Sequence, residues 1–177
     1  MSLPLPPPDL PAIAARVRAL AAEFGFQRCG IADIDLAEDE THLRDWLSKG
    51  LYGTMDWMAQ HGDKRSRPQE LIPGTVRVIS VGLDYGRNDS DDAWHTLADG
   101  ERAYVARYAL GRDYHKLMRN RLQKLATRLQ EEVGAFGHRV FVDSAPVLER
   151  ALARNAGLGW IGKHTCLIDK NGGSWFF

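Results

Sequence analysis

The sequence is poor in the residues that build disulfide or metal scaffolds. Its 177 residues include two cysteines, Cys29 and Cys166, which lie far apart and form no CxxC pair. A disulfide framework needs more cysteines, and a cysteine-ligated zinc or iron–sulfur site needs closely spaced ones. The six histidines are dispersed without an HExxH or His–Cys pattern, which argues against a protein-bound zinc site. We therefore expect two reduced thiols in a cytoplasmic protein.

Long apolar runs and an excess of positive charge are also lacking. No stretch approaches the ~18 apolar residues of a membrane span, and the start, MSLPLPPPDLP, does not have the basic region of a signal peptide. We expect no membrane association. Lys+Arg and Asp+Glu both number 23, so the formal net charge is zero, whereas a general nucleic-acid-binding surface is usually basic. Any RNA contact must therefore be a local patch or lie outside this chain.

The pattern of the chain predicts a Pro-rich, flexible arm over residues 1–8 and one domain over residues 9–177. Hydrophobic residues make up 44% of the sequence, which is enough for a core. Helical spacing and capping residues predict helices after Asp9, over 38–49, after Asp113 and around Pro146. Apolar β-rich runs predict strands at 27–33, 75–85, 102–110, 139–143 and 174–177. We expect an α+β domain with a central mixed sheet flanked by helices.

Asp143 is the first candidate for chemistry. It follows the expected strand 139–143 and precedes a helix, which is where open sheets place reactive groups. An aspartate at this position is also a favoured helix N-cap. The two interpretations can coexist.

Two further segments combine glycine or aromatic residues with positive charge. The segment 157–163 holds three glycines in six residues and ends at Lys163, so its backbone could approach a large ligand while Lys163 neutralises an acidic group. The spacing is also that of a helix C-cap and turn. In ARYALGRDYH, Arg107 and Tyr108 precede a helix N-terminus, which favours anions. There the alternative is a cap at Asp113 preceded by half-buried strand residues.

Several segments together resemble one enzyme family. They are YGTMDWM, KRSRPQELIPG, ARYALGRDYH, VFVDSAPVLERALARNAGLGWIGKHT and GGSWFF, and they are similar to the N-terminal half of the epoxyqueuosine reductases from about Gly25 to Phe177. The resemblance implies a nitroreductase-like cobalamin domain similar to that of the reductive dehalogenases. It also implies reduction of epoxyqueuosine to queuosine at the wobble position of tRNA, with Asp143 as the proton donor.

The resemblance further implies cofactors and partners. We expect the polar periphery of cobalamin to contact Arg67, Arg107, Tyr108, Asp143, Lys163 and Ser174. The family's [4Fe–4S] clusters and C-terminal repeats should follow the SWFF segment, so we expect clusters only in the full-length protein, not ligated by this chain. The expected partner of the full-length protein is tRNA carrying epoxyqueuosine. We expect a monomer, and the electron donor stays open.

Two other functions fit the same residues. One is a non-catalytic cobalamin-binding module, and the other is a flavin-dependent reductase of similar fold. Corrin absorption distinguishes a cobalamin protein from a flavoprotein, and turnover with a chemical reductant distinguishes an enzyme from a binding module.

Overall fold

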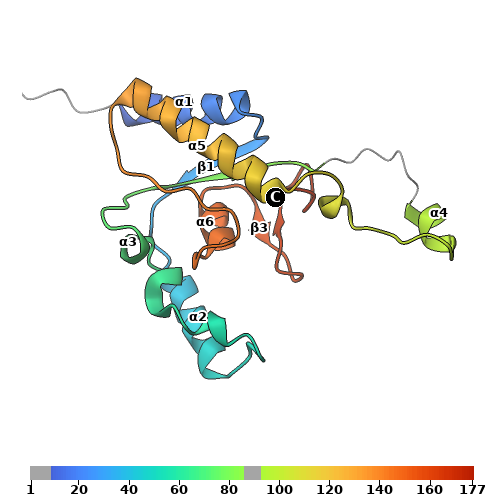
Figure 1. The fold of residues 1–177 in the computed structure, drawn as a ribbon. Helices are drawn as coiled ribbons and strands as arrows, with labels where there is room; N and C mark the ends of the chain where they lie inside the picture. The colour runs from blue at the N-terminus through green and yellow to red at the C-terminus, as the bar shows by residue number, and fades with distance from the viewer. Residues whose placement is uncertain (1–8, 86–92) are drawn as a thin grey trace, which may run out of the picture.

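The computed structural model describes residues 9–85 and 93–177; the expected arm 1–8 lies outside the described residues. The elements follow in the order α1 (Leu10–Glu23), β1 (Arg28–Ala32), α2 (Ala37–Ser48), η1 (Asp56–Met58), η2 (Gly62–Arg65), α3 (Pro68–Leu71), β2 (Val78–Gly82), α4 (Ala93–Ala98), η3 (Arg107–Ala109), α5 (Tyr114–Val133), α6 (Glu149–Asn155), β3 (Trp160–Ile161) and β4 (Leu167–Ile168) (Figure 1). This mixture of helices and short strands agrees with the expected α+β class.

The strands form two small antiparallel sheets. β1 pairs with β2, with Arg28 opposite Gly82, and β3 pairs with β4 in a hairpin. The last residues of the chain continue the first sheet, because Leu83 and Phe177 exchange two backbone hydrogen bonds of 3.0 and 2.8 Å. The strand expected at 174–177 is thus present as a short pairing beside the end of β2.

The expected central mixed sheet is wrong for the described part of the chain. Both sheets there have two strands, and neither 102–110 nor 139–143 forms a strand. In the first stretch the apolar side chains of Tyr104, Val105 and Leu110 are 43–62% exposed, so no apolar face favours pairing. In the second, a tight turn at Asp143 ends the extended run.

Helices cover both faces of the β1–β2 sheet. α1 packs on β1 and on α5, while α6 packs on both strands from the other side (Figure 1). Gly30 permits this second contact, because a Cβ there would lie 2.3 Å from the carbonyl oxygen of Ala156. The main core joins apolar side chains of α1, α5 and the sheet, namely Val17, Leu20, Ala21, Phe26, Leu83, Met118, Leu125, Leu129 and Val142.

The helix ends largely follow the sequence signals. Asp9 caps α1 by accepting from the Ala12 amide at 3.1 Å, and Asp113 caps α5 by accepting from the His115 amide at 3.0 Å. α5 ends at Gly134, whose φ of +93° suits glycine. One boundary is wrong, because α6 begins at Glu149 and leaves Pro146 in the preceding loop.

The helix expected at 38–49 is present as α2, but its packing differs from that of the core helices. Leu43, Trp46 and Leu47 are only half-buried, and none of the described side chains of α2 is fully buried. α2 lies with α3 in a lobe below the sheet (Figure 1). Ion pairs rather than apolar burial dominate this lobe, as described below.

Candidate active site

Asp143 lies at the tip of a tight turn between the extended stretch 139–142 and α6. The amide of Ser144 donates to the carbonyl of Val142 at 2.7 Å, and Asp143 between them has a φ of +56°. This left-handed conformation is unusual for a non-glycine residue, although aspartate tolerates it better than most. Val142 anchors the turn in the core, whereas the side chain of Asp143 is 52% exposed.

The interpretation of Asp143 as a helix N-cap is wrong. α6 begins at Glu149, and Leu148 occupies its N-cap position. Asp143 is therefore six residues before the first helical residue and cannot reach its free amides as a cap does. Its carboxylate is held by other groups instead.

Two aromatic residues at the start of α5 hold the Asp143 carboxylate. The Tyr114 hydroxyl donates to Oδ2 at 2.5 Å, and Nε2 of His115 lies 3.3 Å from the same oxygen. Nδ1 of His115 lies 3.0 Å from Oδ1 of Asp113, so the imidazole bridges two carboxylates. The ring of Phe177 stacks on Tyr114 with centroids 3.7 Å apart. The end of the chain, the start of α5 and the Asp143 turn thus meet at one point.

The surroundings fix the protonation of two members of this cluster. Burial and the hydrogen bond to Asp143 raise the pKa of Tyr114 above its usual value, so the phenol stays a donor at neutral pH. The hydrogen bond from His115 lowers the pKa of Asp113, so that carboxyl stays ionised. The Tyr114 phenol is therefore a fixed donor to Asp143.

Glu149 is a second carboxyl at this site, and sequence reasoning missed it. Burial, and then the neighbouring charge of Asp143, raise the pKa of Glu149 to about 7. Its Oε1 atom is buried and lacks a hydrogen-bond partner among the described residues. In the sequence Glu149 is an acidic residue in the first turn of a helix, which is common, so the pattern carried no signal.

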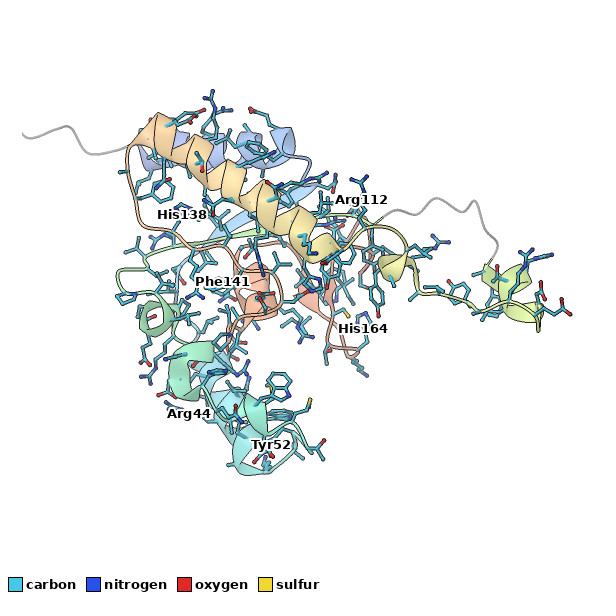
Figure 2. All side chains as sticks on the ribbon, viewed as in Figure 1. Arg44, Tyr52, Arg112, His138, Phe141 and His164 are labelled. Carbon is cyan, nitrogen blue, oxygen red and sulfur yellow. The ribbon has the colours of Figure 1, made fainter. Side chains whose placement is uncertain are left out.

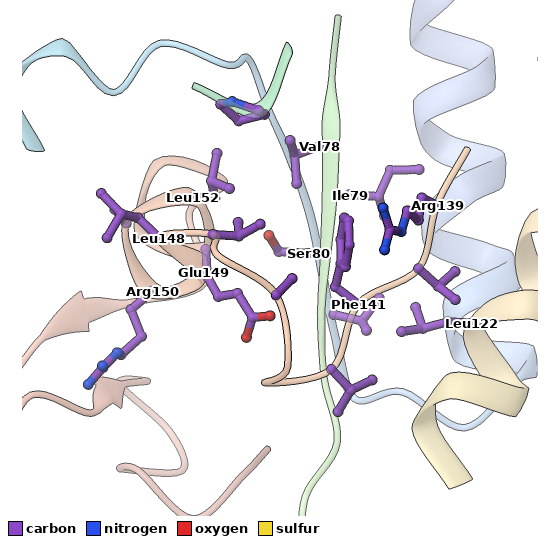
Figure 3. Close-up of a pocket in the computed structure, with 18 of the residues that line it drawn as sticks. Val78, Ile79, Ser80, Leu122, Arg139, Phe141, Leu148, Glu149, Arg150 and Leu152 are labelled. Atoms are coloured by element: carbon purple, nitrogen blue, oxygen red, sulfur yellow. The ribbon is translucent and has the colours of Figure 1, made fainter. Parts of the chain in front are cut away.

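The turn borders a large cavity of about 2240 Å³. This is about twice the upper volume of ordinary small-ligand pockets, roughly 1,000 Å³. Of the six residues expected to contact the cofactor, Asp143, Tyr108 and Ser174 line it. Glu149 extends into it from the start of α6, with Ser80 of β2 and Phe141 nearby (Figure 3).

The other three expected residues lie outside the lining of this cavity. The guanidinium of Arg107 sits over the Trp175 ring, 5.3 Å from its centroid, and Lys163 is exposed after β3. Arg67 lies in the α2–α3 lobe, which Figure 2 shows around Arg44 and Tyr52. There it forms ion pairs with Glu40 at 2.8 Å and with Glu70 at 3.0 Å.

The glycine-rich segment 157–163 closes α6 and enters the β3–β4 hairpin. Gly157 has a φ of +82° just after the helix, as a C-cap requires. A Cβ on Gly159 would lie 2.1 Å from the carbonyl oxygen of Ile168. The close approach at Gly159 is thus to β4, which supports the interpretation of this segment as a helix end and turn.

The remaining features concern metals, thiols and membranes. Within residues 9–85 and 93–177, no three His, Cys, Asp or Glu side chains are grouped to hold a metal ion. Cys29 and Cys166 are both free thiols, the first half-buried and the second exposed. No helix in the described part of the chain is long and apolar enough to cross a membrane.

The fold is that of epoxyqueuosine reductases of known structure. The enzyme from Streptococcus thermophilus superposes with a TM-score of 0.76 at 23% identity, covering 92% of this chain and 43% of that one. An epoxyqueuosine reductase crystallised with an epoxyqueuosine-modified tRNA stem loop has a TM-score of 0.77 at 22% identity, covering 96% and 44%. The Bacillus subtilis enzyme, in a structure with an aspartate-bearing catalytic loop swung out of its active site, matches equally well.

Sequence comparison finds relatives of the same kind. The family model described as "Epoxyqueuosine reductase QueG, DUF1730" matches residues 65–144. The epoxyqueuosine reductase of Xanthomonas campestris is 78% identical over the whole chain, which covers 50% of that protein. Those of Pseudomonas aeruginosa and Escherichia coli are 58% and 52% identical over 98% and 100% of the chain, covering 48% and 46% of their lengths. The chain is therefore a homologue of the epoxyqueuosine reductases, as its motifs predicted, and it spans about half the length of these relatives.

Proposed function

We propose that this chain forms the cobalamin-binding, proton-donating part of an enzyme that reduces epoxyqueuosine to queuosine in tRNA. The observation that carries the proposal is the Asp143 carboxyl at the edge of a cavity large enough for a macrocyclic cofactor. The names of the relatives support the reaction, and the stem-loop complex of one enzyme of the same fold supports tRNA as the partner.

The residues around the cavity fit a corrin in size and chemistry. The cavity is walled largely by apolar side chains, and two residues that carry hydroxyl groups, Tyr108 and Ser174, are among those that line it. Hydroxyl groups can hydrogen-bond the amides that flank a corrin. We propose that Tyr108 and Ser174 contact the polar periphery of the corrin. Arg107, Lys163 and Arg67 were expected to do the same, but they do not line the cavity. When bound and reduced, cobalamin would supply the electron pair.

Asp143 would supply the proton that the reaction needs. An epoxide oxygen leaves poorly as an alkoxide, and a carboxylic acid beside it lowers the barrier by general acid catalysis. Tyr114 and His115 both contact Oδ2 of Asp143. The other carboxyl oxygen, Oδ1, would then carry the proton toward a substrate in the cavity. The aspartate-bearing catalytic loop of the Bacillus subtilis enzyme supports this role for the Asp143 turn.

The proposal is tested in two steps. The chain is first mixed with cob(II)alamin, or with flavin, and the absorption of the protein fraction is recorded after gel filtration. We expect stoichiometric corrin bands; flavin bands alone would indicate the flavin-dependent reductase. Single-turnover reduction of an epoxyqueuosine-modified stem loop, with the cobalt reduced chemically beforehand, then separates an enzyme from a binding module.

A further inference from the structure

The side chain of Asp143 depends on α5 for its orientation. It stands at a tight turn and is 52% exposed, so packing does not select one rotamer for it. Among the described residues, its carboxylate has two polar contacts, the Tyr114 hydroxyl at 2.5 Å and Nε2 of His115 at 3.3 Å. Both fall on Oδ2. These two contacts therefore decide where the other oxygen, Oδ1, points.

The ring of Tyr114 is itself held on both faces. Phe177 stacks on it with ring centroids 3.7 Å apart and planes 7° apart. His115 stacks on it with centroids 4.0 Å apart and planes 26° apart. Two rings this close and this nearly parallel cannot share one face of the phenol, so they lie on opposite faces. The hydroxyl of Tyr114 can leave Asp143 only if its ring slides out from between these neighbours.

Phe177 is fixed in turn by the backbone of the first sheet. It exchanges hydrogen bonds of 3.0 and 2.8 Å with Leu83, which is buried in the main core just after β2. Its ring also lies 4.7 Å from that of Tyr85, centroid to centroid. Figure 1 shows the end of the chain beside the start of α5. A segment remote in sequence from Asp143 thus reaches its carboxylate through one intervening ring.

We propose that Tyr114 is a positioning residue that orients the Asp143 carboxyl for proton donation, and that Phe177 holds Tyr114 in the orientation this requires. The inference rests on the proposed function of Asp143 and names the residues that make this carboxyl an effective acid. Tyr114 keeps its own proton throughout, because burial and the hydrogen bond to Asp143 raise the pKa of the phenol.

The hydrogen bond from Tyr114 aids the proton transfer in two ways. It fixes the rotation of the carboxyl, and an acid already in position reacts faster than one that must first find its orientation. When a proton leaves Oδ1, negative charge spreads over both oxygens, and a hydrogen bond to a charged acceptor is stronger than one to a neutral acceptor. The contact on Oδ2 thus strengthens during the transfer. Such a contact raises the rate more than it raises affinity.

A double-mutant cycle in unfolding tests the contact without cofactor or turnover. The urea midpoints of the wild type, Tyr114→Phe, Asp143→Gly and the double variant are measured, since glycine adopts the φ of +56° without strain. We expect the double variant to lose less than the sum of the single losses, because either change already removes the bond. The control cycle replaces Tyr114→Phe by Tyr104→Phe, whose ring is 43% exposed in another segment, and it should be additive. Additive losses for Tyr114 and Asp143 as well would overturn the inference.

Single turnover tests whether Tyr114 acts through Asp143. In the cobalamin-loaded protein, with the cobalt reduced beforehand, we expect Tyr114→Phe to slow epoxide reduction by about tenfold. Cobalamin affinity should be unchanged, and Tyr104→Phe should react as the wild type does. In the Asp143→Asn background the same Tyr114→Phe change should cause no further loss, because no acid remains to be oriented.

Two other outcomes of this experiment separate the two proposals. A further tenfold loss in the Asp143→Asn background would show that Tyr114 acts independently of Asp143, and would overturn the inference alone. Activity of Asp143→Asn near the wild-type rate would overturn the proposed role of Asp143 itself.

The part assigned to Phe177 is tested by removing its ring and keeping its backbone. Phe177→Leu retains the pairing with Leu83 but loses the stack on Tyr114, and we expect single turnover to slow by about threefold. Phe177→Tyr keeps an aromatic ring and should restore the wild-type rate. A wild-type rate in Phe177→Leu, with an unchanged circular dichroism spectrum, would overturn this part of the proposal.

Discussion

Two regions of this molecule gather charged side chains, and they do so in opposite ways. In the α2–α3 lobe, Arg67 and Arg44 share the carboxylates of Glu40 and Asp63 at 2.7–3.4 Å, so each charge meets its opposite. At the Asp143 turn, the Tyr114 hydroxyl donates to the carboxylate and the His115 imidazole contacts it, while the Glu149 carboxyl lines the same cavity. The first arrangement satisfies charges and stabilises a lobe that has little apolar burial. The second places carboxyls at the cavity where, in the proposed function, Asp143 donates a proton.

The largest expected effect breaks the second region at its proposed proton donor. Asp143→Asn removes the acidic proton, and asparagine also tolerates the φ of +56° at this position. We expect a folded protein whose free energy of unfolding changes by less than ~1 kcal/mol. Epoxide reduction should fall by about 10²–10⁴-fold, measured as single turnover with the cobalt reduced beforehand. The matched variant Asp113→Asn, which keeps the Asp143 carboxyl, should lose far less.

The next effect separates the two regions by their response to a rise in pH from about 4.5 to about 7. The folded-state pKa of Glu149, about 7, lies above its ordinary value of 4.5, so its contribution to stability is fully present below pH 4.5 and is lost as pH rises through about 7. We expect the free energy of unfolding to fall by about 2–3 kcal/mol across this window. Urea titrations of Glu149→Gln should show a flatter pH profile. A profile as steep as that of the wild type would contradict the burial of this carboxyl.

A smaller effect concerns the packing of the β3–β4 hairpin. In Gly159→Ala the new Cβ would lie 2.1 Å from the Ile168 carbonyl oxygen, so the β3–β4 hairpin must shift. We expect a loss of about 2 kcal/mol in the free energy of unfolding. The control Gly157→Ala meets no atom within 4 Å and carries only the strain of a positive φ. Thermal unfolding of the two variants should therefore rank Gly159→Ala as the less stable.

The smallest effect on function is expected in the ionic lobe. Arg67 holds the pKa of Glu40 at about 2, below its ordinary 4.5, so this pair stabilises the fold above pH 4.5 and the contribution is lost as pH falls through about 2. Arg67→Ala should remove that acid dependence in unfolding titrations. It should change cobalamin affinity by less than about twofold, whereas Ser174→Ala, at the cavity, should weaken it more. Equal losses would place Arg67 among the cofactor contacts after all.

Local signals predicted individual elements well and their assembly poorly. Asp9 and Asp113 cap the helices that they were expected to begin, and Gly134 ends the longest one. Strand pairing was less predictable, because 139–143 has the composition of a strand but turns away at Asp143 before finding a neighbour. The composition of a segment gives only its preference for extended backbone. To become a strand, the segment also needs a neighbouring segment that pairs with it in register.

The candidate site shows the same division. Asp143, Tyr108 and Ser174 were chosen from motifs, and the cavity joins them. Arg67 was chosen for its charge, and three carboxylates from its own lobe surround it. Glu149 carried no signal, because a glutamate in the first turn of a helix is ordinary wherever solvent can reach it.

The sequence by itself determined which known enzymes the chain resembles and most of the helix limits, because these depend on residue type and on neighbours within one turn of chain. Only the tertiary structure decided which charges are satisfied. It brought Arg67 to Glu40 and left one carboxyl oxygen of Glu149 buried without a hydrogen-bond partner among the described residues. Desolvation and electrostatic pairing depend on distances between segments that are remote in sequence, so no local pattern encodes them.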